Sequence, residues 1–209
     1  MAIKLSCPSC GYGISLLTKS PQIVVCPACN TTSELEHSAF KEIGKFAFLA
    51  DSLSRFDIGT EFRYGGKIYK PVGRVRYDYG KGYWDEWYVQ IGPSYVWISE
   101  DEGDIAFETE VRPNLEMIPP FNRLAVGKHV KIGNNNYVVA EKGRCRMVGC
   151  EGELPFKIIP NEEYDYVDLL GKGAQSYSIE YESDKIVCFS GKWIDPFDIE
   201  DLQHGWFND

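Results

Sequence analysis

The sequence predicts a mainly β protein that carries a small metal-binding head at its N-terminus. Two observations support this prediction. Two Cys-x-x-Cys pairs lie within the first 29 residues, and from Phe56 onward apolar and polar residues alternate in short runs separated by Gly- and Asn-rich turns. The chain has 209 residues, 44% of them hydrophobic and 25% charged, which is typical of a soluble globular protein.

We expect four segments along the chain. The first is a zinc ribbon at 1–33, and the second is a helical connector at 34–54. A first β-module at 55–120 and a second at 121–209 then form a duplicated antiparallel body, shaped as a barrel or a sandwich.

The two cysteine pairs have the spacing of a four-cysteine zinc site, with 15 residues between them. They are Cys7-Pro-Ser-Cys10 and Cys26-Pro-Ala-Cys29. Each pair can form a turn whose sulfurs converge, and Gly11 and Asn30 follow where such a turn needs a positive φ. Four thiolates leave no position for water, so we expect one structural zinc ion, with a redox dithiol pair or an iron centre as alternatives. The motif resembles the rubredoxin-like zinc ribbons at the head of many bacterial proteins.

The connector is predicted from helical spacing. Phe40, Ile43, Ala47 and Ala50 follow one another at intervals of 3, 4 and 3 residues between Glu34 and Leu53. We expect this helix to pack one apolar face onto the downstream body, with an amphipathic helix that binds a partner as the alternative.

An internal duplication is visible in the body. Residues 58–69 align with residues 126–137 without a gap, at an offset of 68. The recurring positions are Gly59, Gly65 and Tyr69, which become Gly127, Gly133 and Tyr137. Both glycine pairs fall where hairpin turns are expected, so the repeat predicts two similar β-modules.

Charge and targeting signals exclude several classes of protein. The chain has 22 Lys and Arg against 31 Asp and Glu, a net charge of −9, which disfavours generic nucleic-acid binding. No run of residues approaches the about 18–20 apolar residues of a membrane span. The N-terminus carries neither a secretory nor a lipoprotein signal, so we expect a cytoplasmic protein. In that compartment Cys145, Cys150 and Cys188 are expected to be buried thiols, with a second metal or redox site as the alternative.

The segment from Val72 to Val89 resembles the bacterial domain-of-unknown-function 4178 family. So do Trp97-Ile-Ser-Glu100, Gly152-Glu-Leu-Pro-Phe156 and Gly191-Lys-Trp-Ile194, and the similarity spans about residues 55–200. The resemblance implies a cytoplasmic, β-rich, non-enzymatic accessory protein, of a kind associated with polyamine-synthase-like enzymes, ion channels and membrane-stress proteins. It assigns no activity and no site residue.

The densest candidate site lies within this segment. It comprises Trp84, Asp85, Glu86, Trp87 and Tyr88. Aromatic rings interleaved with charge are typical of recognition surfaces, so we predict that these residues contact a protein partner. The alternative is that alternate rings fill the interior, while Arg74 and Arg76 on the other face pair with Asp78, Asp85 or Glu86.

The sequence therefore predicts a non-catalytic binding or scaffold protein that presents an exposed aromatic and acidic surface to a protein partner, and the family resemblance implies a role in membrane stress. One alternative is a sensor of a polyamine or another small cation. It would use the acidic turns Glu100–Asp104 and Glu180–Asp184 and requires a concave pocket walled by carboxylates and rings. The other is an enzyme with Glu86 or Glu153 as general acid, which requires two titratable groups within hydrogen-bond reach in a cleft.

Overall fold

The structure is a computed structural model that describes residues 4–36, 39–45, 49, 54–159 and 162–202. The strands of the N-terminal part are β1 (Lys4–Ser6), β2 (Gly13–Ser15), β3 (Ile23–Val25), β4 (Thr31–Glu36) and β5 (Ala39–Lys45). The strands of the body are β6 (Phe62–Tyr64), β7 (Lys67–Asp78), β8 (Tyr83–Ile91), β9 (Ser94–Asp101), β10 (Asp104–Val111), β11 (His129–Ile132), β12 (Asn135–Leu154), β13 (Glu163–Gly171), β14 (Gln175–Tyr181), β15 (Ile186–Ile194) and β16 (Glu200–Asp201). Three short 3-10 helices, η1 (Leu115–Met117), η2 (Phe121–Arg123) and η3 (Pro196–Asp198), complete the described part.

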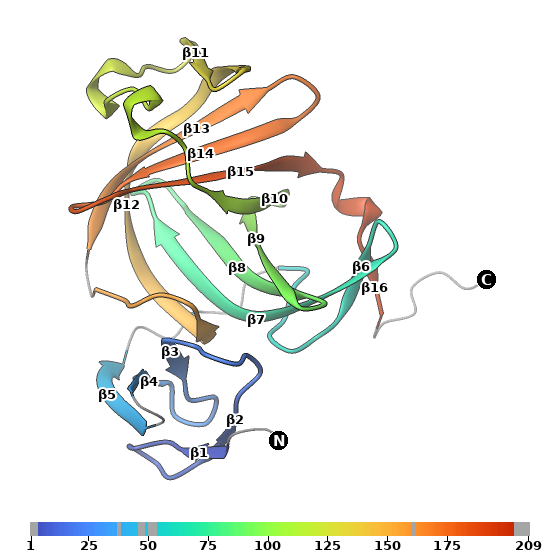
Figure 1. Cartoon of the computed structure of the whole chain (residues 1–209). Helices are drawn as coiled ribbons and strands as arrows, with labels where there is room; N and C mark the ends of the chain where they lie inside the picture. The colour runs from blue at the N-terminus through green and yellow to red at the C-terminus, as the bar shows by residue number, and fades with distance from the viewer. Residues whose placement is uncertain (1–3, 37–38, 46–48, 50–53, 160–161, 203–209) are drawn as a thin grey trace.

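The body is a large antiparallel sheet that curls into a partial ring (Figure 1). Pairing runs in the order β7-β8-β9-β10-β15-β14-β13-β12, and β12 also pairs with β7. Strand β12 can join two neighbours because its first part pairs with β13 and its second part, from Arg146 to Gly152, pairs with β7. The expected β-modules at 55–120 and 121–209 therefore contribute strands to one shared sheet.

Irregularities in β12 and β7 give the ring its curvature. Register shifts lie between Val139 and Glu141 and between Met147 and Gly149 of β12, and such bulges bend a strand and increase its twist. Gly152 has a φ of +69°, and a side chain there would collide with the carbonyl oxygen of Val72. Glycine is thus required where the end of β12 crosses closely over β7.

The duplication is present in the backbone as well as in the sequence. The hairpin β6–β7 begins with the Gly59 amide donating to the Pro71 carbonyl, and the hairpin β11–β12 begins with the Gly127 amide donating to the Val139 carbonyl, both at 2.8 Å. The two glycines have φ angles of +84° and +81°. The repeated residues therefore mark the same turn in both copies.

The expected connector helix is wrong over the residues that the structure describes. Residues 34–36 lie in β4 and residues 39–45 form β5, and these two strands pair with each other and extend the ribbon sheet beyond residue 33. The pairing of β4 with β3 and β5 outweighs the helical spacing, and it places Phe40 against the apolar cluster of the head. Residues 46–48 and 50–53 lie outside the described part.

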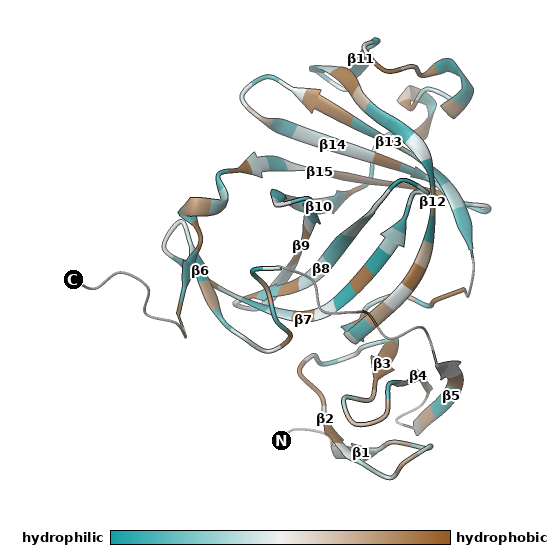
Figure 2. Ribbon diagram, turned by 180° about the vertical axis from the view of Figure 1, so that it is seen from behind, coloured by the Kyte–Doolittle hydropathy of each residue, from teal (hydrophilic) through white to brown (hydrophobic). Residues whose placement is uncertain are grey.

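Each strand of the ring has one face toward the interior and one face away from it. Hydrophobic and hydrophilic residues alternate along β7 and β12 (Figure 2). The outward face of β8, β9 and β10 packs against β6 in a cluster around Phe56, Trp87 and Ile98. The outward face of β13, β14 and β15 packs under β11 and the segment before it, in a cluster around Val130 and Ile179. The interior face carries an apolar cluster around Tyr77, Met147 and Tyr164 beside polar residues such as Glu86 and Asp168.

Candidate metal centre and acidic cavity

The two cysteine turns of the head have the same backbone geometry. The Gly11 amide donates to the Cys7 carbonyl at 2.9 Å, and the Asn30 amide donates to the Cys26 carbonyl at 2.8 Å. Gly11 and Asn30 have φ angles of +75° and +58°, as the sequence predicted for the residue after each pair. Each turn follows a short strand, so β1 and β3 bring the two turns together.

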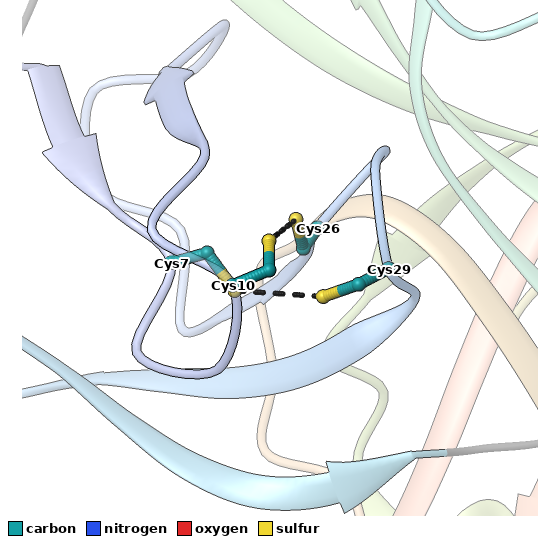
Figure 3. A group of neighbouring side chains, drawn as sticks. All are labelled: Cys7, Cys10, Cys26 and Cys29. Atoms are coloured by element: carbon teal, nitrogen blue, oxygen red, sulfur yellow. Dashed lines mark hydrogen bonds between the residues drawn. The ribbon is translucent and has the colours of Figure 1, made fainter.

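The four sulfurs converge on one point (Figure 3). All of them lie within 4.8 Å of one another, and the Cys7–Cys29 and Cys10–Cys26 sulfur pairs are each 3.7 Å apart. Four sulfurs bound at about 2.3 Å to one tetrahedral ion lie about 3.8 Å apart. All four cysteines are free thiols. The spacing and the donor set therefore fit a metal ion with four thiolate ligands.

Hydrogen bonds already favour one of these thiolates. Thr31 Oγ1 lies 3.2 Å from the sulfur of Cys29, and this contact lowers the pKa of Cys29 to about 6. Burial acts in the opposite direction at Cys26, where it raises the pKa to about 12 although the amides of Ala28 and Cys29 donate to that sulfur. A bound cation would stabilise the thiolate form of both residues.

Glu153 joins the head to the body. Its buried carboxylate accepts hydrogen bonds from the Leu17 amide at 2.5 Å and from the Thr18 amide and hydroxyl at 2.7 and 2.6 Å. Its backbone lies opposite Val24 in the pairing of β12 with β3. This candidate general acid thus holds the loop between β2 and β3, and its oxygens face the head rather than the interior of the ring.

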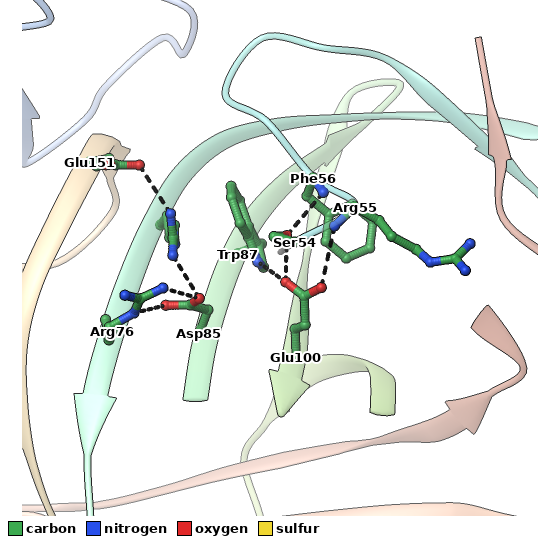
Figure 4. A network of polar contacts seen from close by, with 9 residues as sticks. Ser54, Arg55, Phe56, Arg76, Asp85, Trp87, Glu100 and Glu151 are labelled. Carbon is green, nitrogen blue, oxygen red and sulfur yellow. Dashed lines mark hydrogen bonds and ion pairs between the residues drawn. The ribbon is translucent and has the colours of Figure 1, made fainter. Parts of the chain in front are cut away.

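The outward face of the aromatic segment on β8 is buried. Asp85 and Trp87 are 3% and 1% exposed, so the expected exposed recognition surface is wrong for these two residues. Asp85 accepts hydrogen bonds from Arg76 Nε and Nη2 at 2.8 Å each (Figure 4). It also accepts one from Arg74 Nη2 at 2.7 Å, and the Arg74 guanidinium lies 4.9 Å from the centre of the Trp87 ring. The alternative that Arg74 and Arg76 pair with Asp85 is confirmed.

The inward face of the same segment lies inside the ring. Trp84 packs against Tyr77 and Tyr166, with ring centres 5.1 and 5.0 Å apart, and its Nε1 donates to Glu86 Oε1 at 3.1 Å. Tyr88 packs against Trp97 at 5.0 Å. These contacts place Trp84, Glu86 and Tyr88 on the interior wall rather than on an outer surface.

A cavity of about 430 Å³ opens inside the ring next to Trp84. We call it the acidic cavity. Its lining includes seven carboxylates and no Lys, Arg or His among the described residues. The carboxylates are Glu86, Asp101, Asp104, Glu108, Glu141, Asp168 and Glu180. Trp84, Tyr166 and Trp193 supply aromatic walls.

Burial raises the pKa of five of these carboxylates, because no basic side chain of the described lining stabilises their charged form. It raises the pKa of Glu86 to about 8, that of Asp168 to about 7 and that of Asp101 to about 6, and neighbouring carboxylates add to each shift. The pKa values of Glu108 and Glu180 are raised by burial as well. A cation bound in this cavity would lower these pKa values and so increase the ionised fraction of the carboxylates.

Two polar atoms in this lining have no hydrogen-bond partner within the described residues. They are Oδ1 of Asp101 and Oγ of Ser176, and the Ser176 residue is 3% exposed. A buried polar group without a partner is costly, and in native structures it often marks the position of a bound molecule or a water.

The carboxylates do not form a preformed metal site. Across the part of the chain that the structure describes, the four head cysteines are the group of Cys, His, Asp or Glu side chains whose ligand atoms converge closely enough for one ion. The carboxylates come from β8, β9, β10, β12, β13 and β14 instead, so their charge is spread along the wall.

The acidic turns and the remaining cysteines are placed as follows. Asp101, Asp104 and Glu180, from the two acidic turns, line the acidic cavity, whereas Glu100 accepts a hydrogen bond from Trp87 Nε1 at 3.0 Å on the outer face. Cys145 and Cys150 lie in one apolar cluster and Cys188 in another, so these three residues are buried thiols.

Sequence reasoning missed Glu108, Glu141 and Asp168. Of the three, Asp168 has the clearest signal in the sequence, because it interrupts the apolar run Val167-Asp-Leu-Leu170. A carboxylate at such a position must either pair with a cation or face a polar interior.

The family described as Domain of unknown function (DUF4178) matches residues 57–196. The matched region contains the ring and every carboxylate of the acidic cavity, and it excludes the four cysteines of the head. No curated protein and no solved structure matches the chain. None of the described helices is long and apolar enough to span a membrane.

Proposed function

The chain belongs to the family Domain of unknown function (DUF4178), and we propose that its ring binds a small organic cation without catalysing a reaction. In this proposal the N-terminal head carries one structural zinc ion on Cys7, Cys10, Cys26 and Cys29. The observation that carries the proposal is the set of seven carboxylates around a cavity of about 430 Å³ that has no basic residue in its described lining.

Electrostatics favours a cation in the acidic cavity. Burying several carboxylates without a cationic partner costs free energy, which is why the pKa values of Glu86 and Asp168 rise. A bound cation offsets this cost, because it restores the ionised form of each carboxylate that it touches. Trp84, Tyr166 and Trp193 add ring faces that attract cations within about 6 Å.

An organic cation fits better than a single metal ion. The carboxylates are distributed over six strands and do not converge on one point, whereas a Ca²⁺ or Mg²⁺ site needs six or more oxygens at about 2.0–2.6 Å. The cavity volume also lies in the range of small-molecule sites, about 300–1,000 Å³. A linear polyamine, whose ammonium groups are spaced along a chain, matches the spread of the carboxylates.

We propose binding without catalysis because, of the two candidate general acids Glu86 and Glu153, Glu86 alone lines the acidic cavity. Glu153 already accepts three hydrogen bonds from the head. A scaffold role toward a protein partner is compatible with this proposal, but it would use surfaces other than the buried Asp85 and Trp87.

The zinc proposal rests on the closed set of four thiolates, which leaves no coordination position for water. A head this small buries little apolar surface, so metal binding and folding of the head are expected to be one event. A reducing compartment such as the cytoplasm would keep the thiols available for the ion.

Isothermal titration with spermidine tests the cation proposal. We expect wild type to bind spermidine and the Asp168→Asn and Glu108→Gln variants to bind at least about tenfold more weakly, a loss of about 1.4 kcal/mol each. Glu163→Gln is the matched control, since Glu163 is an exposed carboxylate at the start of the same strand as Asp168. Equal affinity in all four proteins, or no binding by wild type, would refute the proposal. If mass spectrometry detects chemical conversion of spermidine by the protein, the protein is an enzyme instead.

Elemental analysis tests the head. We expect about one zinc per chain in wild type and in the control Cys145→Ser, and a loss of most of the zinc in Cys26→Ser, because three thiolates no longer close the tetrahedron. Full zinc content in Cys26→Ser would show that the ligand set is wrong.

A further inference from the structure

A second cavity, of about 750 Å³, lies at the other end of the ring interior. We call it the apolar cavity. Glu86 and Glu180 line both cavities, so the two spaces adjoin at these carboxylates. The acidic cavity extends from there toward the β9–β10 turn, and the apolar cavity extends toward the segment that follows β12.

The lining of the apolar cavity contrasts with that of the acidic cavity. Half of the residues that line it have large apolar side chains, among them Tyr77, Trp97, Met147, Phe156, Ile159 and Phe189. Two of the basic residues in the lining have carboxylate partners: Lys185 lies 3.1 Å from Glu182, and Lys157 pairs with Glu34. The lining of the apolar cavity holds six carboxylates and three basic residues, so charges of both signs occur there, whereas the described lining of the acidic cavity holds no basic residue.

Part of this apolar wall reaches solvent. Leu115 and Ile159 line the apolar cavity and are 55% and 59% exposed. Large apolar side chains that remain exposed beside a concave surface mark a place where an apolar group of a ligand can be buried.

From these contrasts we propose that the two cavities bind one amphiphilic amine. Its ammonium groups lie among the carboxylates of the acidic cavity, and its hydrocarbon substituent passes Glu86 and Glu180 into the apolar cavity. This inference rests on the proposed function, and it specifies the class of ligand as an amine with an alkyl or acyl substituent rather than an unsubstituted polyamine.

The division of the interior supports this ligand class. Beside Trp97, Met147 and Phe189 an ammonium group would lose its hydration against apolar side chains. A hydrocarbon chain in the same position is stabilised by burial, in proportion to the apolar area removed from water. At the other end, the carboxylates of Glu108 and Asp168 and the hydroxyl of Ser176 offer hydrogen-bond partners to a polar group.

Titration of wild type with two matched amines tests the inference. We expect N1-octylspermidine to bind at least about tenfold more tightly than spermidine, because the octyl chain adds buried apolar area. Octanoate, which has a tail of the same length and the opposite charge, is expected not to bind. Equal affinity for the two amines would overturn the inference while leaving the proposed function intact. Binding of octanoate as tightly as of the octyl amine would overturn both.

Variants locate the tail. Ile159→Ser and Phe156→Ala are expected to remove most of the gain from the octyl group and to leave the affinity for spermidine within about twofold of wild type, which also shows that they fold. Phe197→Ala is the matched control, since Phe197 is 84% exposed on η3 and lines neither cavity. An undiminished octyl gain in both variants would overturn the assignment of the tail to the apolar cavity.

Discussion

Asp85 and Glu86 are neighbours on β8, and they meet opposite surroundings. Asp85 points away from the ring interior and accepts three hydrogen bonds from Arg74 and Arg76. Glu86 points into the ring, where the Trp84 indole donates its one hydrogen bond and no basic residue lines the acidic cavity among the described residues. Two neighbouring carboxylates on one strand therefore differ in their surroundings: Asp85 is part of a completed ion cluster, and Glu86 is one of seven carboxylates around a cavity whose described lining holds no basic residue.

The outward and inward carboxylates differ in whether a nearby cation neutralises their charge, rather than in whether they are buried. The outward cluster adds Glu151, whose carboxylate lies 3.5 Å from Arg74, so its arginines and carboxylates neutralise each other within the protein. The inward carboxylates repel one another instead, and the pKa of Glu180 is raised by burial and then by Glu86. A buried ion cluster that is complete costs little to keep, whereas one partner alone is strongly destabilising.

Removing the carboxylate of the completed cluster is expected to give the largest effect. Asp85→Ala leaves two buried guanidinium groups without their shared partner, so the free energy of unfolding should fall by about 3–5 kcal/mol. Urea unfolding followed by tryptophan fluorescence measures this. A loss below about 1 kcal/mol would mean that Arg74 and Arg76 find another partner and that the outward cluster is not a unit.

Glu86→Gln should act in the opposite direction and depend on pH. The pKa of Glu86 is raised from 4.5 to about 8, so the folded protein holds a proton that the unfolded chain releases. This contribution to stability is present below about pH 4.5 and is lost as the pH rises toward 8. The variant cannot ionise, so it should gain stability over wild type, on the order of a few kcal/mol, between pH 5 and pH 8.

Unfolding free energies of both proteins at pH 5 and pH 8 test this prediction. Saturating spermidine should flatten the pH dependence of wild type, because the ligand stabilises the ionised cavity. If wild type and Glu86→Gln have parallel pH profiles, Glu86 is not an uncompensated carboxylate and the contrast with Asp85 fails.

Arg146→Ala should give the smallest effect. Arg146 lies 3.8 Å from Asp78, and the two side chains are 47% and 40% exposed. An exposed ion pair of this kind contributes less than about 1 kcal/mol. Urea unfolding beside Asp85→Ala checks it, and a loss comparable to that of Asp85→Ala would show that outward ion pairs contribute regardless of burial.

The head and the strands were predictable because their signals are local. Two Cys-x-x-Cys pairs define four ligands without reference to the rest of the chain, and period-two alternation locates strands such as β8 and β10. The helix expected after the head failed because Phe40 and Ile43 also suit a strand, and only the pairing with β4 decides between the two.

The acidic cavity was not predictable from single segments. Alternation shows that a strand has two faces, but it does not show which face points inward, and the usual expectation places charged residues outside. Here the outward faces are covered by β6, β11 and their flanking segments, so Glu108 and Asp168 face inward. Only the register of all the ring strands brings these distant carboxylates together.

Strand β12 has a mechanical consequence for the whole molecule. Near its end, Glu151 and Gly152 pair with β7, and the next two residues, Glu153 and Leu154, pair with β3 of the cysteine head. The pairing of β12 with β7 and the attachment of the head thus share one stretch of backbone. We therefore expect a force or local unfolding at one of these pairings to disturb the other.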